Sequence, residues 1–160
     1  MKNLVRRRVG NTIWALELPA YLKGGLLVRA TWWGGPADEG VGRNEGLAFA
    51  NGLARELEPH DWYCAIRLPV PEPAYREAEY AAWAGAILEV QCPDSGRAVR
   101  LRVLDRGPRD EAFDMSPGAY SYLEIEHDGP DRLVCVGLSE DQDSAPGPWV
   151  YPDAQRWPLE

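Results

Sequence analysis

Two aspartates in the segment GRAVRLRVLDRGPRDEAFDMSPGAY, residues 96–120, are the residues best placed to do chemistry. Asp105 ends a run of alternating character and enters a Gly-Pro turn. Asp114 follows nine positions later, just before a predicted helix start. Two carboxylates on either side of one loop can converge on one groove. That arrangement suits acid/base chemistry at a glycosidic bond, in which a carboxyl group protonates the leaving oxygen.

Both aspartates also have a structural interpretation, and the residues alone leave the two open. An aspartate before Arg-Gly-Pro, as at Asp105, can cap a turn through nearby backbone amides. Asp114 can bind the amides of the helix start that follows it. A carboxyl group that acts as an acid near neutral pH needs a raised pKa, which burial or a second carboxylate provides. Arg106 and Arg109 would oppose that shift if they pair with Asp105.

Composition indicates one globular domain with arms: 160 residues, 45% hydrophobic and 26% charged. The net charge of −8 and the pI of about 4.8 oppose binding to nucleic acid. A basic cluster, Lys2 with residues 6–8, could dock onto an acidic partner. We expect no membrane insertion and no signal peptide, because no apolar run has the required length.

Cysteine usage and motif content predict neither a metal site nor a bound cofactor. Cys64, Cys92 and Cys135 show no metal-ligand spacing and no CxxC pair, so buried free thiols are the favoured interpretation. No nucleotide-binding loop is present in the sequence. The chemistry, if any, is therefore expected to rest on side chains alone.

Short strands separated by Gly/Pro turns dominate the predicted elements. Strands are predicted at 26–33, 62–68, 86–92, 98–105 and 132–138. The turn at 93–97 predicts a hairpin. In the segment 70–85 an Ala/Glu-rich helix is predicted after the two prolines, with Gly85 as its stop, and another helix begins at Pro117 behind the cap Ser116. A short helical turn could lie in 47–58, with a bend at Asn51-Gly52.

The strand density favours a small closed barrel flanked by two arms. The predicted organisation is an N-terminal arm or single edge strand at 1–25, a barrel at 26–138, and a Pro/Trp-rich tail at 139–160. Trp149, Tyr151 and Trp157 make a packed tail the favoured interpretation. Both arms could also engage a larger protein assembly.

Five motifs in one order resemble the double-psi β-barrel of the rare lipoprotein A family, and more distantly expansins and barwin-like proteins. They are ATWWG at 30–34, ANG at 50–52, LP at 68–69, GRAVRLRVLDRGP at 96–108 and DMSPGAY at 114–120. The resemblance covers about residues 28–138, and the DRGP-then-DMS pair is its specific part. It implies a mostly β fold, a six-stranded double-psi β-barrel with one or two short helices.

The resemblance also implies a groove for a polysaccharide, peptidoglycan in lipoprotein A relatives, some of which are lytic transglycosylases. The family's catalytic aspartate maps onto Asp105 as general acid/base, and the second aspartate of its pair maps onto Asp114. The expected ligand contacts are Trp33, Asn51, Tyr63, Arg106 and Tyr120. Because Trp32 and Trp33 are neighbours in a strand, at most one of them faces the groove.

Two departures from the family pattern keep a second hypothesis open. Catalytic members place a histidine in the strand before the LP motif, where this chain has Ala65; His60 lies a few residues upstream. Phe49 replaces the threonine before ANG. The first hypothesis is a wall-directed enzyme, made in the cytoplasm and delivered to the cell wall by a phage particle or lysis machine. The second is a non-catalytic glycan-binding or structural barrel within a larger assembly, such as a virion component.

Overall fold

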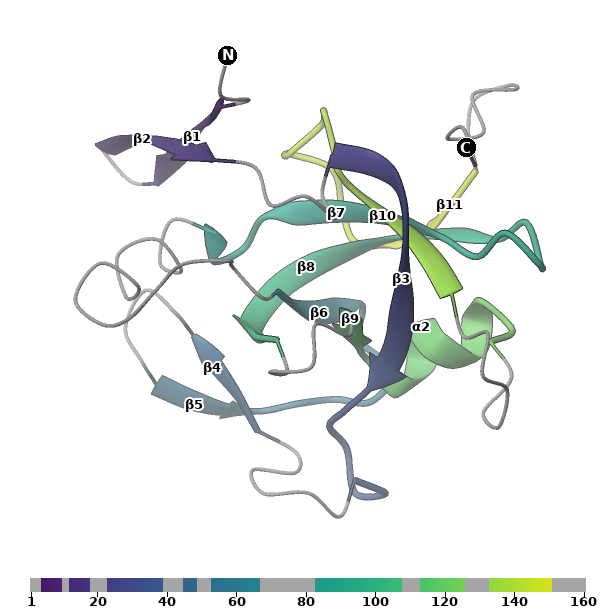
Figure 1. Cartoon of the computed structure of the whole chain (residues 1–160). Helices are drawn as coiled ribbons and strands as arrows, with labels where there is room; N and C mark the ends of the chain where they lie inside the picture. The colour runs from purple at the N-terminus through teal and green to yellow at the C-terminus, as the bar shows by residue number, and fades with distance from the viewer. Residues whose placement is uncertain are drawn as a thin grey trace.

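A computed structural model of the chain describes residues 4–9, 12–17, 23–38, 45–48, 53–66, 83–107, 113–125 and 133–150 (Figure 1). Within these, residues 4–9, 12–17, 23–27, 45–48, 53–56 and 106 are described by their backbone alone. Asn51, Phe49, the Leu68-Pro69 motif and most of the predicted helix at 70–85 lie outside the described residues.

Strands form most of the described chain. The strands are β1 (Leu4–Val9), β2 (Thr12–Glu17), β3 (Lys23–Trp32), β4 (Glu45–Ala48), β5 (Leu53–Glu56), β6 (Tyr63–Ile66), β7 (Ile87–Gln91), β8 (Ala98–Arg106), β9 (Phe113–Met115), β10 (Leu133–Leu138) and β11 (Gly147–Trp149). One short helix, α2 (Pro117–Tyr122), lies between β9 and β10.

Six strands close into a barrel, and β11 adds a seventh to the same sheet. The order is β11-β8-β6-β9-β3-β10-β7, and pairing of β7 with β8 closes the ring (Figure 1). The β3–β9 and β6–β8 pairs are parallel, while the other pairs in the sheet are antiparallel. A closed barrel with two such parallel pairs is compatible with the double-psi topology and confirms the expected fold class.

The hairpin of β7 and β8 has the sequence signals expected of it. The chain reverses through residues 93–97, where Gly96 adopts a φ of +70° that favours glycine. In β8 the alternate residues Val99, Leu101 and Val103 are fully buried. The exposed Arg102 lies between them. Alternation of this kind buries one face of the strand in the barrel.

Helix α2 starts at the predicted cap. The Ser116 hydroxyl accepts a hydrogen bond from the Ala119 amide at 3.2 Å, and Pro117 occupies the first helical position. Gly118 donates its amide to the Pro59 carbonyl at 2.8 Å, which joins the helix start to the turn before β6. The helix therefore covers one end of the barrel.

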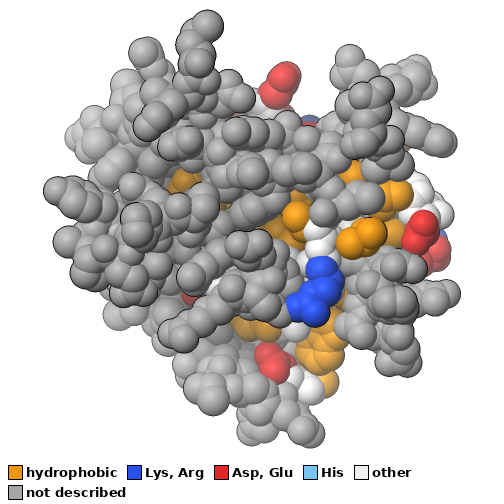
Figure 2. Space-filling view, viewed as in Figure 1, with side chains coloured by type: hydrophobic (Ala, Val, Ile, Leu, Met, Phe, Trp, Pro, Cys, Tyr) orange, Lys and Arg blue, Asp and Glu red, His pale blue; other side chains and the backbone are white. Residues whose placement is uncertain are grey.

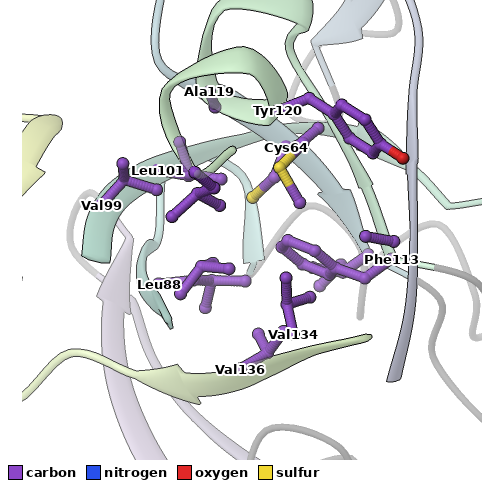
Figure 3. Packing of buried hydrophobic residues seen from close by; sticks show 14 of the residues in the cluster. Cys64, Leu88, Val99, Leu101, Phe113, Ala119, Tyr120, Val134 and Val136 are labelled. Atoms are coloured by element: carbon purple, nitrogen blue, oxygen red, sulfur yellow. The ribbon is translucent and has the colours of Figure 1, made fainter. Parts of the chain in front are cut away.

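The barrel interior is filled by aliphatic and aromatic side chains from its strands and from α2. Figure 3 shows Cys64, Leu88, Val99, Leu101, Phe113, Ala119, Tyr120, Val134 and Val136 converging on one centre. Trp83 is also fully buried in this cluster. Burial of this apolar surface is the main stabilising contribution to the fold.

Two parts of the chain differ from their predicted structure, and a third agrees with the favoured interpretation. Residues 1–25 do not hold a single edge strand: β1 and β2 pair as a separate antiparallel hairpin, and Gly24-Gly25 lie inside β3. The predicted helical turn in 47–58 is wrong, because β4 and β5 pair as a hairpin there. In the predicted tail, β11 pairs with residues 98–100 of β8, so this part is packed, as favoured.

The described surface combines hydrophobic and charged side chains. In the view of Figure 2, described hydrophobic side chains reach the surface beside described charged ones. Among the described residues, no helix has both the length and the apolar character needed to cross a membrane.

Candidate functional site

The two aspartates singled out by the sequence lie in one row across the barrel wall. Ala65 in β6 is opposite Asp105 in β8 on one side and opposite Asp114 in β9 on the other. Thr31 in β3 is opposite Asp114 and extends the row. Neighbouring strands are about 4.8 Å apart, so the backbones of the two aspartates are roughly 10 Å apart, with Ala65 between them.

A β-bulge places Asp105 in this row. Cys64 is opposite Val103, but the next residue, Ala65, is opposite Asp105, which leaves Leu104 as an extra residue in β8. Asp105 is two positions after the core residue Val103. In a regular strand without the bulge, it would therefore face the core with Val103. Bulges re-aim side chains in this way and are frequent beside functional sites.

The row lies on the side of the wall opposite the core. Cys64 belongs to the core cluster, so its neighbour Ala65 faces the other way. Asp105 and Asp114 are both half-buried, whereas Ala65 is only 2% exposed. The two carboxylates therefore stand on either side of a small, covered residue.

Asp114 is held by a hydrogen bond, and its charge acts on two neighbouring side chains. Its carboxylate accepts a hydrogen bond from the Thr31 hydroxyl at 2.9 Å. Burial, followed by the negative charge of Asp114, raises the pKa of the Cys64 thiol. The same two causes raise the pKa of the Tyr63 phenol, to which Asp38 and Asp61 add smaller contributions. Three carboxylates, those of Asp114, Asp38 and Asp61, are therefore close enough to Tyr63 to disfavour its ionised form.

Trp33 and Tyr63 form a second feature next to the row. The Tyr63 hydroxyl donates a hydrogen bond to the Trp33 carbonyl at 2.8 Å. The two rings are in edge-to-face contact with centroids 4.7 Å apart. Tyr63 is 1% exposed and Trp33 is half-buried, while Trp32 packs against the core. Trp33 is thus more accessible to solvent than Tyr63, and the buried Tyr63 ring packs against it.

The described side chains do not place the other three predicted contacts, those of Tyr120, Arg106 and Asn51, at this row. Tyr120 in α2 is fully buried in the core cluster (Figure 3). Arg106 is opposite Ile66 at the end of β8, where only its backbone is described. Asn51 lies outside the described residues. These three assignments stay predictions.

His60 does not occupy the position of Ala65. It is exposed in a turn that packs against the start of α2, before β6 begins, whereas Ala65 is near the end of that strand. Five residues of extended chain span about 16 Å. No imidazole therefore separates the two aspartates at the position where the family resemblance places one.

Three residues of this region were missed in the sequence. Thr31 donates a hydrogen bond to Asp114, and Asp38 and Asp61 add negative charge near Tyr63. Alternation could have found Thr31, because it is two positions from Trp33 in the same strand. Asp38 and Asp61 come from loops, and no local sequence pattern predicts that they approach Tyr63.

Metal and thiol chemistry receive no support from the described ranges. Within them, no group of three or more His, Cys, Asp or Glu side chains is arranged to hold a metal ion. The three cysteines are buried and free, as favoured from their spacing. No protein-family model and no curated protein matches the chain.

Proposed function

We propose that this chain is a polysaccharide-directed double-psi barrel protein of the rare lipoprotein A type, with peptidoglycan glycan as its ligand. The observation that carries the proposal is the row Asp105–Ala65–Asp114, in which two carboxylates that the sequence places nine residues apart lie opposite the same residue. The half-buried Trp33 ring beside the row is suited to stack on a sugar.

In the enzymatic form of the proposal, Asp105 acts as general acid and then as general base. Its carboxyl proton passes to the glycosidic oxygen as the bond from the anomeric carbon breaks. The sugar's own 6-hydroxyl then bonds to that carbon and gives its proton to the Asp105 carboxylate. The product is an anhydro sugar, and no water is consumed. Asp114 supplies the negative field that favours the protonated form of a neighbouring carboxyl group.

Ala65 supports the alternative that the barrel binds glycan without cleaving it. A methyl group between the two aspartates can neither donate nor accept a proton. Catalytic relatives in the resemblance carry histidine at this position. The two forms share one ligand and one binding face, so a single set of variants separates them.

The test is digestion of purified peptidoglycan sacculi by wild type, Asp105→Asn and Asp114→Asn, with soluble products identified by mass spectrometry. Asp94→Asn, in the exposed turn between β7 and β8, serves as the matched control. Anhydro-muropeptides released by wild type and by the control, but not by Asp105→Asn, would establish the lytic transglycosylase.

If no variant releases products, co-sedimentation of the folded protein with sacculi decides the matter. Binding that Trp33→Ala weakens and Asp94→Asn does not would establish the non-catalytic form. A protein that neither releases products nor sediments with sacculi would contradict the proposed function in both forms.

A further inference from the structure

The N-terminal 25 residues of this chain are basic, whereas the rest of the chain is acidic overall. Residues 1–25 contain five of the 17 basic residues and one of the 25 acidic residues, so their net charge is +4. The other residues carry the balance of the overall −8, which is −12. A charge division of this size favours contact between the N-terminal part and an acidic surface.

The basic residues 6–8 lie in a hairpin that pairs with nothing else in the described chain. Among the described strands, β1 and β2 pair only with each other, and Figure 1 shows them to one side of the barrel. An isolated two-stranded hairpin is marginally stable in water. Contact with a second surface would stabilise it.

An acidic loop between β10 and β11 offers such a surface. Glu140, Asp141 and Asp143 are all exposed. Their loop is fixed by Gln142, whose side-chain amide accepts a hydrogen bond from the Ile87 amide at 3.0 Å and donates one to the Ile87 carbonyl at 2.9 Å. A loop fixed in advance loses little conformational entropy when a partner binds.

The strand that follows the hairpin, β3, begins at the end of the barrel where the acidic loop lies. Lys23, where β3 begins after the hairpin, is opposite Gly137 in β10. Strand β10 ends at Leu138, the residue after Gly137, and the acidic loop follows directly. A basic and an acidic segment attached to the same end of the barrel make that end complementary to a copy of itself, turned by half a revolution.

We propose that two copies of this chain form a two-fold symmetric dimer through this end. The basic hairpin of each copy, which carries residues 6–8, lies against Glu140, Asp141 and Asp143 of the other copy. Both contacts form together, because a two-fold axis makes each the image of the other. At about 0.15 M salt, charge effects beyond roughly 8 Å are screened, so the overall negative charge does not prevent association, while close pairs retain their attraction.

Sedimentation velocity of the full chain tests the dimer. Wild type is expected to dimerise at about 0.15 M salt, with a dissociation constant at least tenfold higher at about 1 M salt. Arg6→Glu/Arg7→Glu/Arg8→Glu and Glu140→Lys/Asp141→Lys/Asp143→Lys are each expected to be monomeric. An equimolar mixture of the two variants should associate again, because both contacts then pair opposite charges.

A matched control reverses three exposed acidic residues at the opposite end of the barrel, Glu58→Lys/Asp94→Lys/Glu124→Lys. It changes the net charge as much as the loop variant does and should still dimerise. A wild-type monomer at both salt concentrations would overturn the proposal and leave the hairpin for a different acidic partner. Failure of the mixed variants to associate, with circular dichroism unchanged, would overturn it as well.

Discussion

At the scale of single residues, Trp33 owes its position to the close approach of Gly34 to Tyr63. Gly34 has a φ of +92°, and a Cβ atom there would collide with the Tyr63 hydroxyl oxygen. Tyr63 cannot move aside, because it is buried and hydrogen-bonded to the Trp33 carbonyl. The position therefore requires glycine both for its backbone conformation and for space.

Gly34→Ala is expected to lower the free energy of unfolding by about 2–4 kcal/mol, through backbone strain and overpacking together. Gly96→Ala is the matched control, since Gly96 also has a positive φ but has open space where its Cβ would lie. Its cost should be about 1 kcal/mol, from conformation alone. Urea denaturation measures both, and equal losses would contradict the role of Tyr63.

Two buried thiols predict how stability depends on alkaline pH. Burial raises the pKa of Cys64 and Cys135 above the ordinary 9.0, with Asp114 adding to the first and Cys92 to the second. Above pH 9 the unfolded chain loses these protons while the folded chain keeps them. The unfolded state then binds fewer protons, so stability falls as pH rises.

The free energy of unfolding of the reduced protein should be insensitive to these thiols below about pH 8 and decline above pH 9, by at most about 1.4 kcal/mol per pH unit for each thiol. Cys64→Val/Cys135→Val should flatten this decline, because valine has no proton to lose. Urea titrations between pH 7 and 10.5 make the comparison. If the stability of both proteins declined in parallel with pH, the decline would not come from these thiols.

The position of Asp105 shows what the sequence could and could not predict at this scale. Its identity as a candidate follows from the DRGP motif. Strict alternation from Val99 to Val103 would, however, place Asp105 in the core with them. Only the extra residue Leu104 turns it toward Ala65. A bulge depends on the register of the partner strand, which comes from a distant part of the chain and leaves no local pattern.

At the scale of elements, strands with strong alternation or clear turns were predictable. The β7–β8 hairpin and the capped start of α2 follow from local residues. Residues 47–58 contain Ala, Leu and Glu, which favour helix locally, but pairing of β4 with β5 prevails. Strands β9 and β11 are three residues long, and their pairing with distant strands is invisible in sequence periodicity.

Replacing Gly118 in α2 by alanine should destabilise the protein, although the same change in a helix usually stabilises it. In a helix, Gly→Ala ordinarily stabilises by about 0.5–1 kcal/mol. Here a Cβ would lie 2.9 Å from the Pro59 carbonyl oxygen and 3.1 Å from the His60 Cα, both backbone atoms. We expect Gly118→Ala to destabilise by about 1–3 kcal/mol. Thermal unfolding beside Ser121→Ala, an exposed site in the same helix, provides the comparison.

The loop after β10 depends on the amide of Gln142. Its nitrogen donates hydrogen bonds to the Ile87 and Ser139 carbonyls, at 2.9 and 2.7 Å. Gln142→Glu places a carboxylate against both carbonyls and should cost about 2–3 kcal/mol at pH 7, more than Gln142→Ala. The difference between the variants should shrink near pH 4, where the carboxyl group regains a proton. An unchanged difference at pH 4 would mean that the two carbonyls do not depend on this donor.

At the scale of the whole molecule, barrel and hairpin should differ in local stability. The six barrel strands each pair on both sides, so their amides are expected to exchange with solvent only when the whole domain unfolds. Among the described strands, the β1–β2 hairpin forms its own sheet and lacks this pairing on both sides. In about 1 M salt, where the proposed dimer dissociates, its amides should exchange within minutes.

Hydrogen exchange followed by mass spectrometry, with peptides over residues 4–17 and 87–102, measures this contrast. The β7–β8 hairpin is the internal control, because it is also antiparallel and local but belongs to the barrel. At about 0.15 M salt the proposed dimer should slow exchange over residues 4–17 and leave the control unchanged, since contact between copies adds stability only at that end. Equal protection of the two hairpins in about 1 M salt would show that the first is already stabilised within one chain. The division of the molecule into a self-sufficient barrel and a dependent hairpin would then be wrong.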